Sequence, residues 1–225
     1  MRTTVKLTAF FALLAITVFS CSKLDVVGND SVRAFNELLR SAPQLVSEDK
    51  ANGGWYVVAP DNGARFIWSK NFAESLSYDV MLEFGAEPFI AAGLDPSKLP
   101  ANFIFRDGRL TVGTKLGNEV LSYKGEATPL ASYEQIVKLK RSSIGYHGEM
   151  DHYGISLGDG NMFEWAKNLA ANDKDIVFVL NPDPFIAAGV NPARIDGWVF
   201  AKVTVDDANG KPVQVDKILK PFNLN

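Results

Sequence analysis

The sequence predicts an α+β protein made of two similar halves, at about 30–128 and 131–225, that form one compact pseudo-two-fold body. Within each half we expect a helix, a strand, a helix, a strand, a short helix and two strands. Three observations lead to this prediction. A hexapeptide is repeated, apolar segments alternate with turn residues, and no linker rich in Pro, Gly or Ser separates the halves.

The repeated hexapeptide is Pro-Phe-Ile-Ala-Ala-Gly, which occupies residues 88–93 and again residues 184–189. Upstream identities recur 97 residues apart, including Tyr56 with Tyr153, Gly63 with Gly160, Trp68 with Trp165 and Asn71 with Asn168. After a one-residue gap the separation becomes 96, which relates Asp79 to Asp175. Constant separations over an extended segment indicate an internal duplication.

Each half is expected to open with a helix. In the first half Asp30 or Ser31 is a capping residue, and the apolar residues that follow share one helix face: Val32, Phe35, Leu38 and Leu39. In the second half Ser132 and Gln135 have the spacing of a capping box. The alternation of residues 137–140 is also typical of a strand, so that alternative stays open.

A strand, a helix and a buried strand follow in each half. The strands at residues 55–59 and 153–157 lead into glycine-containing turns. A helix is expected next, because large apolar residues lie four positions apart in both halves: Trp68 with Phe72 and Trp165 with Leu169. Continuous apolar runs then predict buried strands at 79–84 and 175–180.

The last part of each half is expected to contain a short helix and two strands. Proline early in the hexapeptide and glycine at its end are typical of a helix of little more than one turn, packed through its Phe and Ile side chains. Asp95-Pro96 and Asn191-Pro192 start a second such turn. The closing strands are expected at 102–106, 109–113, 198–205 and 212–215.

The first 21 residues have the features of an export signal. A basic start with Arg2 and Lys6 precedes an apolar stretch from Leu7 to Phe19. Because a membrane-spanning helix needs about 20 apolar residues, this stretch is short for a permanent span. We therefore expect a signal peptide at residues 1–20 that is removed.

Residues 18–21, Val-Phe-Ser-Cys, resemble the lipobox of bacterial lipoproteins. The resemblance covers residues 1–21 only, and it implies cleavage before Cys21 and attachment of lipid to its sulfur. Residues 21–29 would then hold the lipidated cysteine and a short tether to the membrane of the cell envelope. Ser22 after the cysteine implies the outer membrane if the host has one. An ordinary secretory signal with an incidental cysteine is the alternative.

Composition excludes several functional classes. The net charge is −3, so no overall basic field favours nucleic acid, and a single cysteine excludes a disulfide framework. The sequence has no P-loop and no G-x-G-x-x-G motif. We therefore expect a non-catalytic binding or interaction protein. Its partner would be a glycan, a peptide or an envelope protein, and a purely structural role is a further alternative.

The repeated polar and aromatic residues are the first candidate site: Trp68, Asn71, Trp165 and Asn168. A tryptophan and an asparagine beside one groove between the halves would bind a sugar or peptide through ring stacking and amide hydrogen bonds. The alternative is that each asparagine bonds to the backbone.

The second candidate site is a polar cluster that contains both histidines: His147, Glu149, Asp151 and His152. In an extended segment the first three share one face and His152 points to the other. Imidazole nitrogens and carboxylate oxygens bind divalent cations, so a structural or hydrolytic metal site is the alternative function. A polar loop or edge strand without metal also fits this segment. No other cofactor is expected.

Overall fold

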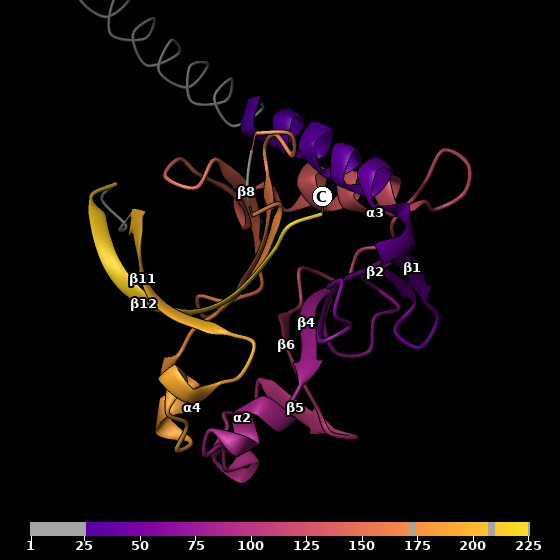
Figure 1. Ribbon diagram of the computed structural model, residues 1–225. Helices are drawn as coiled ribbons and strands as arrows, with labels where there is room; N and C mark the ends of the chain where they lie inside the picture. Colours follow the sequence, from indigo (N-terminus) through magenta and orange to yellow (C-terminus); the bar gives the residue numbers. More distant parts are fainter. Residues whose placement is uncertain (1–25, 172–173, 207–209, 225) are drawn as a thin grey trace, which may run out of the picture.

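The computed structural model describes residues 26–171, 174–206 and 210–224. Within these ranges the chain forms two six-stranded antiparallel sheets together with helices, which confirms the α+β class (Figure 1). The expected signal peptide at 1–20 and Cys21 lie outside the described residues. No helix in the described ranges is long and apolar enough to cross a membrane.

The first sheet, here called sheet A, has the strand order β1-β2-β3-β4-β6-β5. Its strands are β1 (Val46–Asp49), β2 (Gly54–Val58), β3 (Ala64–Ser69), β4 (Val80–Gly85), β5 (Phe103–Arg106) and β6 (Arg109–Thr114). The 3-10 turn η1 (Pro43–Leu45) precedes β1, and the helix α2 (Glu87–Ala91) and the 3-10 turn η2 (Pro96–Lys98) connect β4 to β5.

The second sheet, sheet B, has the order β11-β12-β10-β9-β8-β7. Its strands are β7 (Ile144–His147), β8 (His152–Ser156), β9 (Met162–Ala166), β10 (Ile176–Leu180), β11 (Val199–Asp206) and β12 (Pro212–Phe222). The 3-10 turn η3 (Arg141–Ser143) precedes β7, and α4 (Asp183–Ala187) and η4 (Pro192–Arg194) precede β11. Starting from β7, the order of sheet B is β7-β8-β9-β10-β12-β11, which is the same topology as sheet A. In each half the last strand lies next to the fourth strand, β6 next to β4 and β12 next to β10.

The N-terminal helix, described over residues 26–41, begins earlier than the sequence predicts. It includes residues 26–29, which were expected to be tether, and it continues through Asp30 and Ser31 without a cap there. The Ser31 hydroxyl instead donates to the Gly28 carbonyl, 2.7 Å away, inside the helix. A serine in a helix can bond to the preceding turn in this way, so its presence does not require a helix start.

The second long helix, α3 (Pro129–Leu139), also starts before the predicted capping box. Thr128 is the N-cap, and its Oγ1 accepts a hydrogen bond from the Ala131 amide at 3.1 Å. Pro129 follows at the first helical position, where its missing amide hydrogen costs nothing. Ser132 is therefore a buried helix residue, and the strand alternative for residues 137–140 is wrong because the helix extends to Leu139.

The helices predicted around Trp68 and Trp165 are wrong, because these residues lie on strands β3 and β9. Side chains alternate along both strands, with Phe66, Trp68, Phe163 and Trp165 on the face toward the core. Each strand is hydrogen-bonded on both edges, β3 to β2 and β4, and β9 to β8 and β10. Central pairing and a period of two therefore outweigh the four-residue spacing of apolar residues. The strand β1 was not predicted. Strand β7, which ends at His147 at the edge of sheet B, agrees with the edge strand that was one interpretation of the segment around His147.

The strand pairing in the hairpins β2–β3 and β8–β9 differs by one residue from the separation of 97 that relates the two halves in the sequence. Val57 lies opposite Phe66 in sheet A, and Ile155 lies opposite Phe163 in sheet B. Val57 and Ile155 are therefore equivalent, although they are 98 residues apart. The β8–β9 connection between these partners is one residue shorter than the β2–β3 connection, which accounts for the shift.

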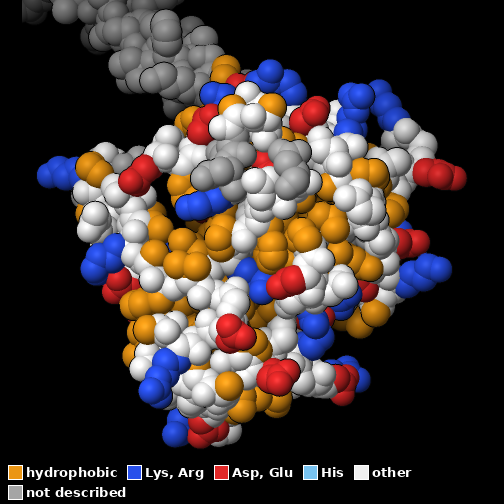
Figure 2. Space-filling view, viewed as in Figure 1, with side chains coloured by type: hydrophobic (Ala, Val, Ile, Leu, Met, Phe, Trp, Pro, Cys, Tyr) orange, Lys and Arg blue, Asp and Glu red, His pale blue; other side chains and the backbone are white. Residues whose placement is uncertain are grey.

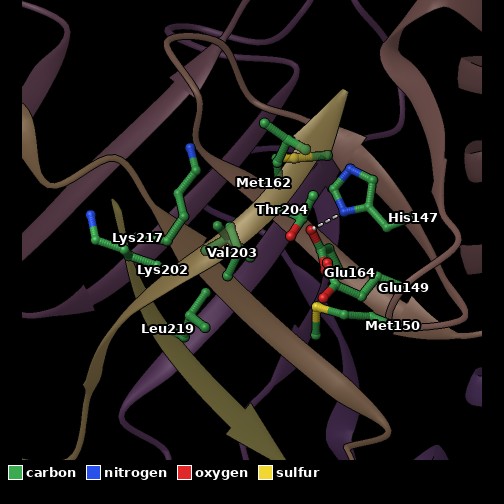
Figure 3. Close-up of a pocket in the computed structure, with 12 residues that line it drawn as sticks. His147, Glu149, Met150, Met162, Glu164, Lys202, Val203, Thr204, Lys217 and Leu219 are labelled. Atoms are coloured by element: carbon green, nitrogen blue, oxygen red, sulfur yellow. Dashed lines mark ion pairs between the residues drawn. The ribbon is translucent and has the colours of Figure 1, made fainter. Parts of the chain in front are cut away.

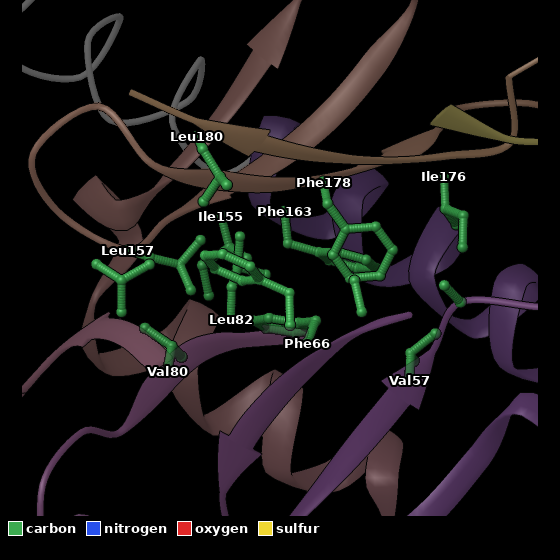
Figure 4. Close-up of a cluster of buried hydrophobic side chains, with 14 of the residues drawn as sticks. Val57, Phe66, Val80, Leu82, Ile155, Leu157, Phe163, Ile176, Phe178 and Leu180 are labelled. Carbon is green, nitrogen blue, oxygen red and sulfur yellow. The ribbon is translucent and has the colours of Figure 1, made fainter. Parts of the chain in front are cut away.

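Aromatic residues from both sheets form one core (Figure 4). In its middle the rings of Phe66 and Phe163 stack with centroids 4.4 Å apart and an angle of 5°. At one end Phe35 of the N-terminal helix stacks on Tyr133 of α3 at 4.2 Å, and both rings contact Trp165. Since each buried aromatic removes about 150–250 Å² from water, these contacts account for much of the apolar burial.

The two hexapeptides form the short helices α2 and α4, as predicted, at the other end of the core (Figure 1). Phe89 and Phe185 are fully buried, with ring centroids 5.0 Å apart. Ile90 and Ile186 were expected to pack with them, but both are close to half exposed. A helix of barely more than one turn can bury only one of two adjacent side chains against a single neighbour.

Two reciprocal hydrogen bonds join the segments that follow α2 and α4. The Asp95 amide donates to the Ala188 carbonyl and the Asn191 amide donates to the Ala92 carbonyl, each at 2.9 Å. The backbones approach closely at Gly93, whose φ is +109°. A Cβ atom at this position would lie 2.6 Å from the Gly189 carbonyl oxygen. Glycine is required here both for the backbone angle and for this approach.

We predict that Gly93→Ala lowers the free energy of unfolding more than Gly125→Ala does, because only Gly93 lies against the Gly189 carbonyl. Gly125 has a similar φ of +101°, but a Cβ atom there would have no neighbouring atom within 4 Å. Gly125→Ala should cost about 1–2 kcal/mol, and Gly93→Ala about 2 kcal/mol more because two hydrogen bonds are disturbed. Urea unfolding measures both, and equal losses would contradict the role of this contact.

Candidate functional site

The best-defined pocket lies on the face of sheet B that is turned away from the core, here called the outer face (Figure 3). Its cavity volume is about 190 Å³. Side chains of β9, β10, β11 and β12 form its walls, together with the turn between β7 and β8. Its lining is mainly apolar, with a few charged or titratable groups: His147, Glu149, Glu164, Lys202 and Lys217.

The alternation of β9 places Glu164 in this pocket. Phe163 and Trp165 point to the core, so Met162 and Glu164 point to the outer face. Glu164 is nevertheless only 2% exposed. A carboxylate is rarely buried to this extent unless it is paired, because removing it from water is costly.

A glycine on β8 allows a histidine to reach this carboxylate. Gly154 on β8 lies opposite Glu164, and Gly145 on β7 lies opposite Gly154. Since Gly154 has no side chain, His147 on β7 extends across β8, and its Nδ1 lies 3.0 Å from Glu164 Oε1. A Cβ on Gly154 would lie 3.2 Å from Glu164 Cγ and 3.0 Å from Met162 Cε.

The second carboxylate oxygen of Glu164 is not satisfied by the protein. Oε2 is buried and has no hydrogen-bond partner in the part of the chain that the structure describes. A buried acceptor left without a donor costs about 1–3 kcal/mol, and more when it is charged. The pocket wall therefore contains an acceptor that a bound donor would stabilise.

The opposite wall is formed by the long, curved strands β11 and β12 (Figure 1). Lys217 Nζ donates to the Gly160 carbonyl at 2.8 Å, and Lys202 Nζ pairs with Asp216 at 2.9 Å. Burial lowers the pKa of Lys217, while the nearby carboxylate of Glu164 acts in the opposite direction. Both ammonium groups thus have partners within their own half of the chain.

The outer face of sheet A carries a different arrangement. There the Glu83 carboxylate pairs with Arg65, 2.8 Å away, and with Arg109. The Arg65 guanidinium also lies over the Tyr56 ring, 5.2 Å from its centroid. A carboxylate on this face therefore has two cationic partners from the chain itself, in contrast to Glu164.

The predicted metal cluster is divided between separate places. His147 and Glu149 line the pocket, but His152 lies away from it, with its ring nitrogens 2.5 and 2.6 Å from the carbonyl oxygens of Met150 and Lys174. Asp151 accepts a hydrogen bond from the Tyr146 hydroxyl at 2.5 Å, which raises the pKa of Tyr146 to about 12. Within the described ranges, no three His, Cys, Asp or Glu side chains are placed to hold a metal ion.

The predicted groove residues do not meet either. Trp68 and Trp165 are fully buried in the core, and Trp68 Nε1 donates to the Pro129 carbonyl at 3.1 Å. Asn71 Oδ1 accepts from the Ala73 and Leu121 amides, and Asn168 Oδ1 accepts from the Ala170 amide. Each asparagine thus bonds to the backbone, which was the alternative interpretation.

Sequence reasoning missed Glu164, although a signal for it exists. Once residues 162–166 are assigned to a strand, their alternation separates Glu164 from the core residues on either side of it. Its counterpart in the first half is Ile67, 97 residues earlier, so the carboxylate is also a departure from the repeat. The incorrect helix assignment for this segment concealed both features.

In comparisons with known proteins, the chain matches no protein-family model, no curated protein and no solved structure. The function is therefore inferred from the chemistry of the pocket itself. Among the described residues its lining contains no serine or cysteine, and Thr204 is its one aliphatic hydroxyl. An apolar pocket with a few polar groups is typical of a ligand-binding site.

We predict that Trp68→Ala and Trp165→Ala each lower the free energy of unfolding by about 3–5 kcal/mol, because each removes a fully buried indole from the core. Phe105→Ala, which truncates a ring that is 45% exposed, is the control and should cost clearly less. Guanidinium unfolding measures all three. A loss below about 1 kcal/mol for either tryptophan would contradict its place in the core.

We also predict that Gly154→Ala weakens the contact between His147 and Glu164, because the new methyl group would press on Glu164. Nitrogen-15 NMR of the His147 ring, which reports hydrogen bonding at Nδ1, should change in this variant. Gly145→Ala is the matched control, since no atom lies within 4 Å of its Cβ position. An unchanged His147 spectrum in Gly154→Ala would show that the glycine does not govern the contact.

Proposed function

We propose that this protein is a lipid-anchored binding protein of the bacterial cell envelope, which holds a small ligand in the pocket of sheet B without chemical conversion. The lipid would be attached at Cys21, as the resemblance of residues 18–21 to a lipobox implies. The binding site is then a pocket on the outer face of one sheet, and not a groove at the two tryptophans.

One observation carries the binding role: Glu164 is buried in the pocket wall and its Oε2 has no partner among the described side chains and backbone groups. Leaving such an acceptor without a donor reduces stability. Two other buried polar atoms, Trp165 Nε1 and Asp175 Oδ1, also have no partner among the described residues, but neither residue lines the pocket. At Glu164 a ligand in the pocket would supply the missing donor.

A non-catalytic role is favoured over metal-dependent hydrolysis because the residues of the expected metal cluster are separated. His152 and Asp151 are engaged by other groups of the chain.

We further propose that the two halves arose by internal duplication and then diverged. The repeated hexapeptide and the six antiparallel strands of each half support this origin. The two outer faces then differ because sheet A carries Ile67 where sheet B carries Glu164. Ligand binding would accordingly belong to the second half alone.

The position of the first described residue is compatible with a lipid anchor at Cys21. Residue 26, the first described residue, lies at the end of the molecule that carries the N-terminal helix and α3 (Figure 1). The short helices α2 and α4 lie at the opposite end. Lipid on Cys21 would therefore hold the first end at the membrane and direct α2 and α4 away from it.

Native mass spectrometry of the protein extracted from its own host's membranes tests the proposal. We expect a chain that begins at Cys21 with a covalent acyl increment, and a small additional mass that is lost on denaturation. Leu219→Trp fills the pocket, so this variant should keep the acyl increment and lose the additional mass.

The control variant is Thr111→Trp, because Thr111 lies opposite Glu83 in sheet A as Leu219 lies opposite Val179 in sheet B. This variant should keep both masses. Retention of the small mass in Leu219→Trp would contradict binding in this pocket, and the absence of an acyl increment would contradict the anchor.

A further inference from the structure

We infer that the ligand of the sheet B pocket is a small primary amine, bound as an ammonium ion, with an apolar body about the size of a benzyl group. This inference rests on the proposed function, and it adds the chemistry of the ligand.

The need for a cationic donor follows from Glu164. Its Oε1 is held by His147 at 3.0 Å, while Oε2 has no donor within the described ranges. An ammonium group offers three donors and a positive charge, and hydrogen bonds between charged partners are about twice as strong as neutral ones. An alcohol would supply a donor without the charge.

Sheet A shows how this fold satisfies a carboxylate when no ligand is required. Glu83 on its outer face is paired with the guanidinium groups of Arg65 and Arg109. No arginine lines the pocket at Glu164, whose carboxylate faces a cavity instead. The chain places His147 on Oε1 and has Lys217 nearby, but Lys217 bonds to the Gly160 carbonyl, so the ligand would supply the cationic donor that Oε2 lacks.

The two lysines of the pocket give no reason to expect an anionic group on the ligand, because both already have partners in the chain. Lys202 and Lys217 lie on the side of the cavity away from Glu164 (Figure 3). Their ammonium groups already bond to Asp216 and to the Gly160 carbonyl. An amine without a carboxylate is thus a better match than a zwitterion.

The size and the apolar character of the ligand's body follow from the part of the cavity between Glu164 and the two lysines. Met162, Val203 and Leu219 lie between them and are apolar (Figure 3). A dry cavity of roughly 150 Å³ is enough to hold benzene. The cavity of about 190 Å³ therefore accommodates an aromatic ring with a one-carbon arm that carries the amine. Methionine sulfur also makes favourable contacts with aromatic rings.

On the face shown in Figure 2, lysine, arginine and acidic side chains are interspersed around hydrophobic areas, without one continuous patch of either sign among the described residues. General surface charge therefore gives little reason for an amine to prefer this protein. A preference for amines would have to come from a specific group such as Glu164.

The test compares three ligands of similar shape, namely benzylamine, benzyl alcohol and benzoate, with the acylated full chain in detergent. Methionines carry ¹³C-labelled methyl groups, so that Met150 and Met162 report on the pocket while Met81, on the outer face of sheet A, reports on non-specific effects. Benzylamine should shift the Met150 and Met162 signals at about tenfold lower concentration than benzyl alcohol. Benzoate should be weaker than both.

Glu164→Gln removes the charge and keeps the shape of the side chain, so it should bring the affinity for benzylamine to within about threefold of that for benzyl alcohol. Glu126→Gln, which removes a charge from an exposed residue outside the pocket, should preserve the tenfold preference. Equal affinities for amine and alcohol in the unmodified protein would overturn the inference and leave the pocket's binding role intact. An absence of shifts at Met150 and Met162 with all three compounds would count against the binding role itself.

Discussion

The packing of the two sheets against each other is the constraint on which the rest of the structure depends. The parallel stack of Phe66 on Phe163 lies at the middle of the interface, and the two strands that carry these rings lie inside their sheets, paired on both edges. Because aromatic side chains bury large areas and prefer defined geometries, this interface fixes both the distance and the orientation of the sheets. The two helices at one end, and α2 and α4 at the other, close the core that the sheets leave open.

This arrangement uses one face of each sheet for stability and leaves the other face to vary. On sheet A the outer face is self-satisfied, because Glu83 is neutralised by two arginines of the same sheet. On sheet B, Gly154 leaves no side chain opposite Glu164 on the neighbouring strand, and the curved β11 and β12 form an opposite wall. A similar scaffold thus presents a closed polar network in one half and a pocket with an unsatisfied acceptor in the other.

Much of the local structure follows from the sequence because it depends on short-range chemistry. The short helices α2 and α4 within the two hexapeptides, and the glycines that follow them, were predicted correctly, since proline and glycine restrict the backbone wherever they occur. The buried strands β4 and β10 were found from continuous apolar runs. The strands β3 and β9 were mistaken for helices, because a four-residue apolar spacing also arises on a strand that alternates and then turns.

The sequence by itself determined the α+β class, the repeated pattern and the positions of most turns, all of which depend on residues close together in the chain. Only the tertiary structure decided what the candidate residues do. Trp68 and Trp165 belong to the core because the sheets meet there, and His147 meets Glu164 because three strands bring them together across Gly154. Whether a carboxylate is satisfied depends on groups distant in sequence, so the open oxygen of Glu164 is visible only in the folded chain.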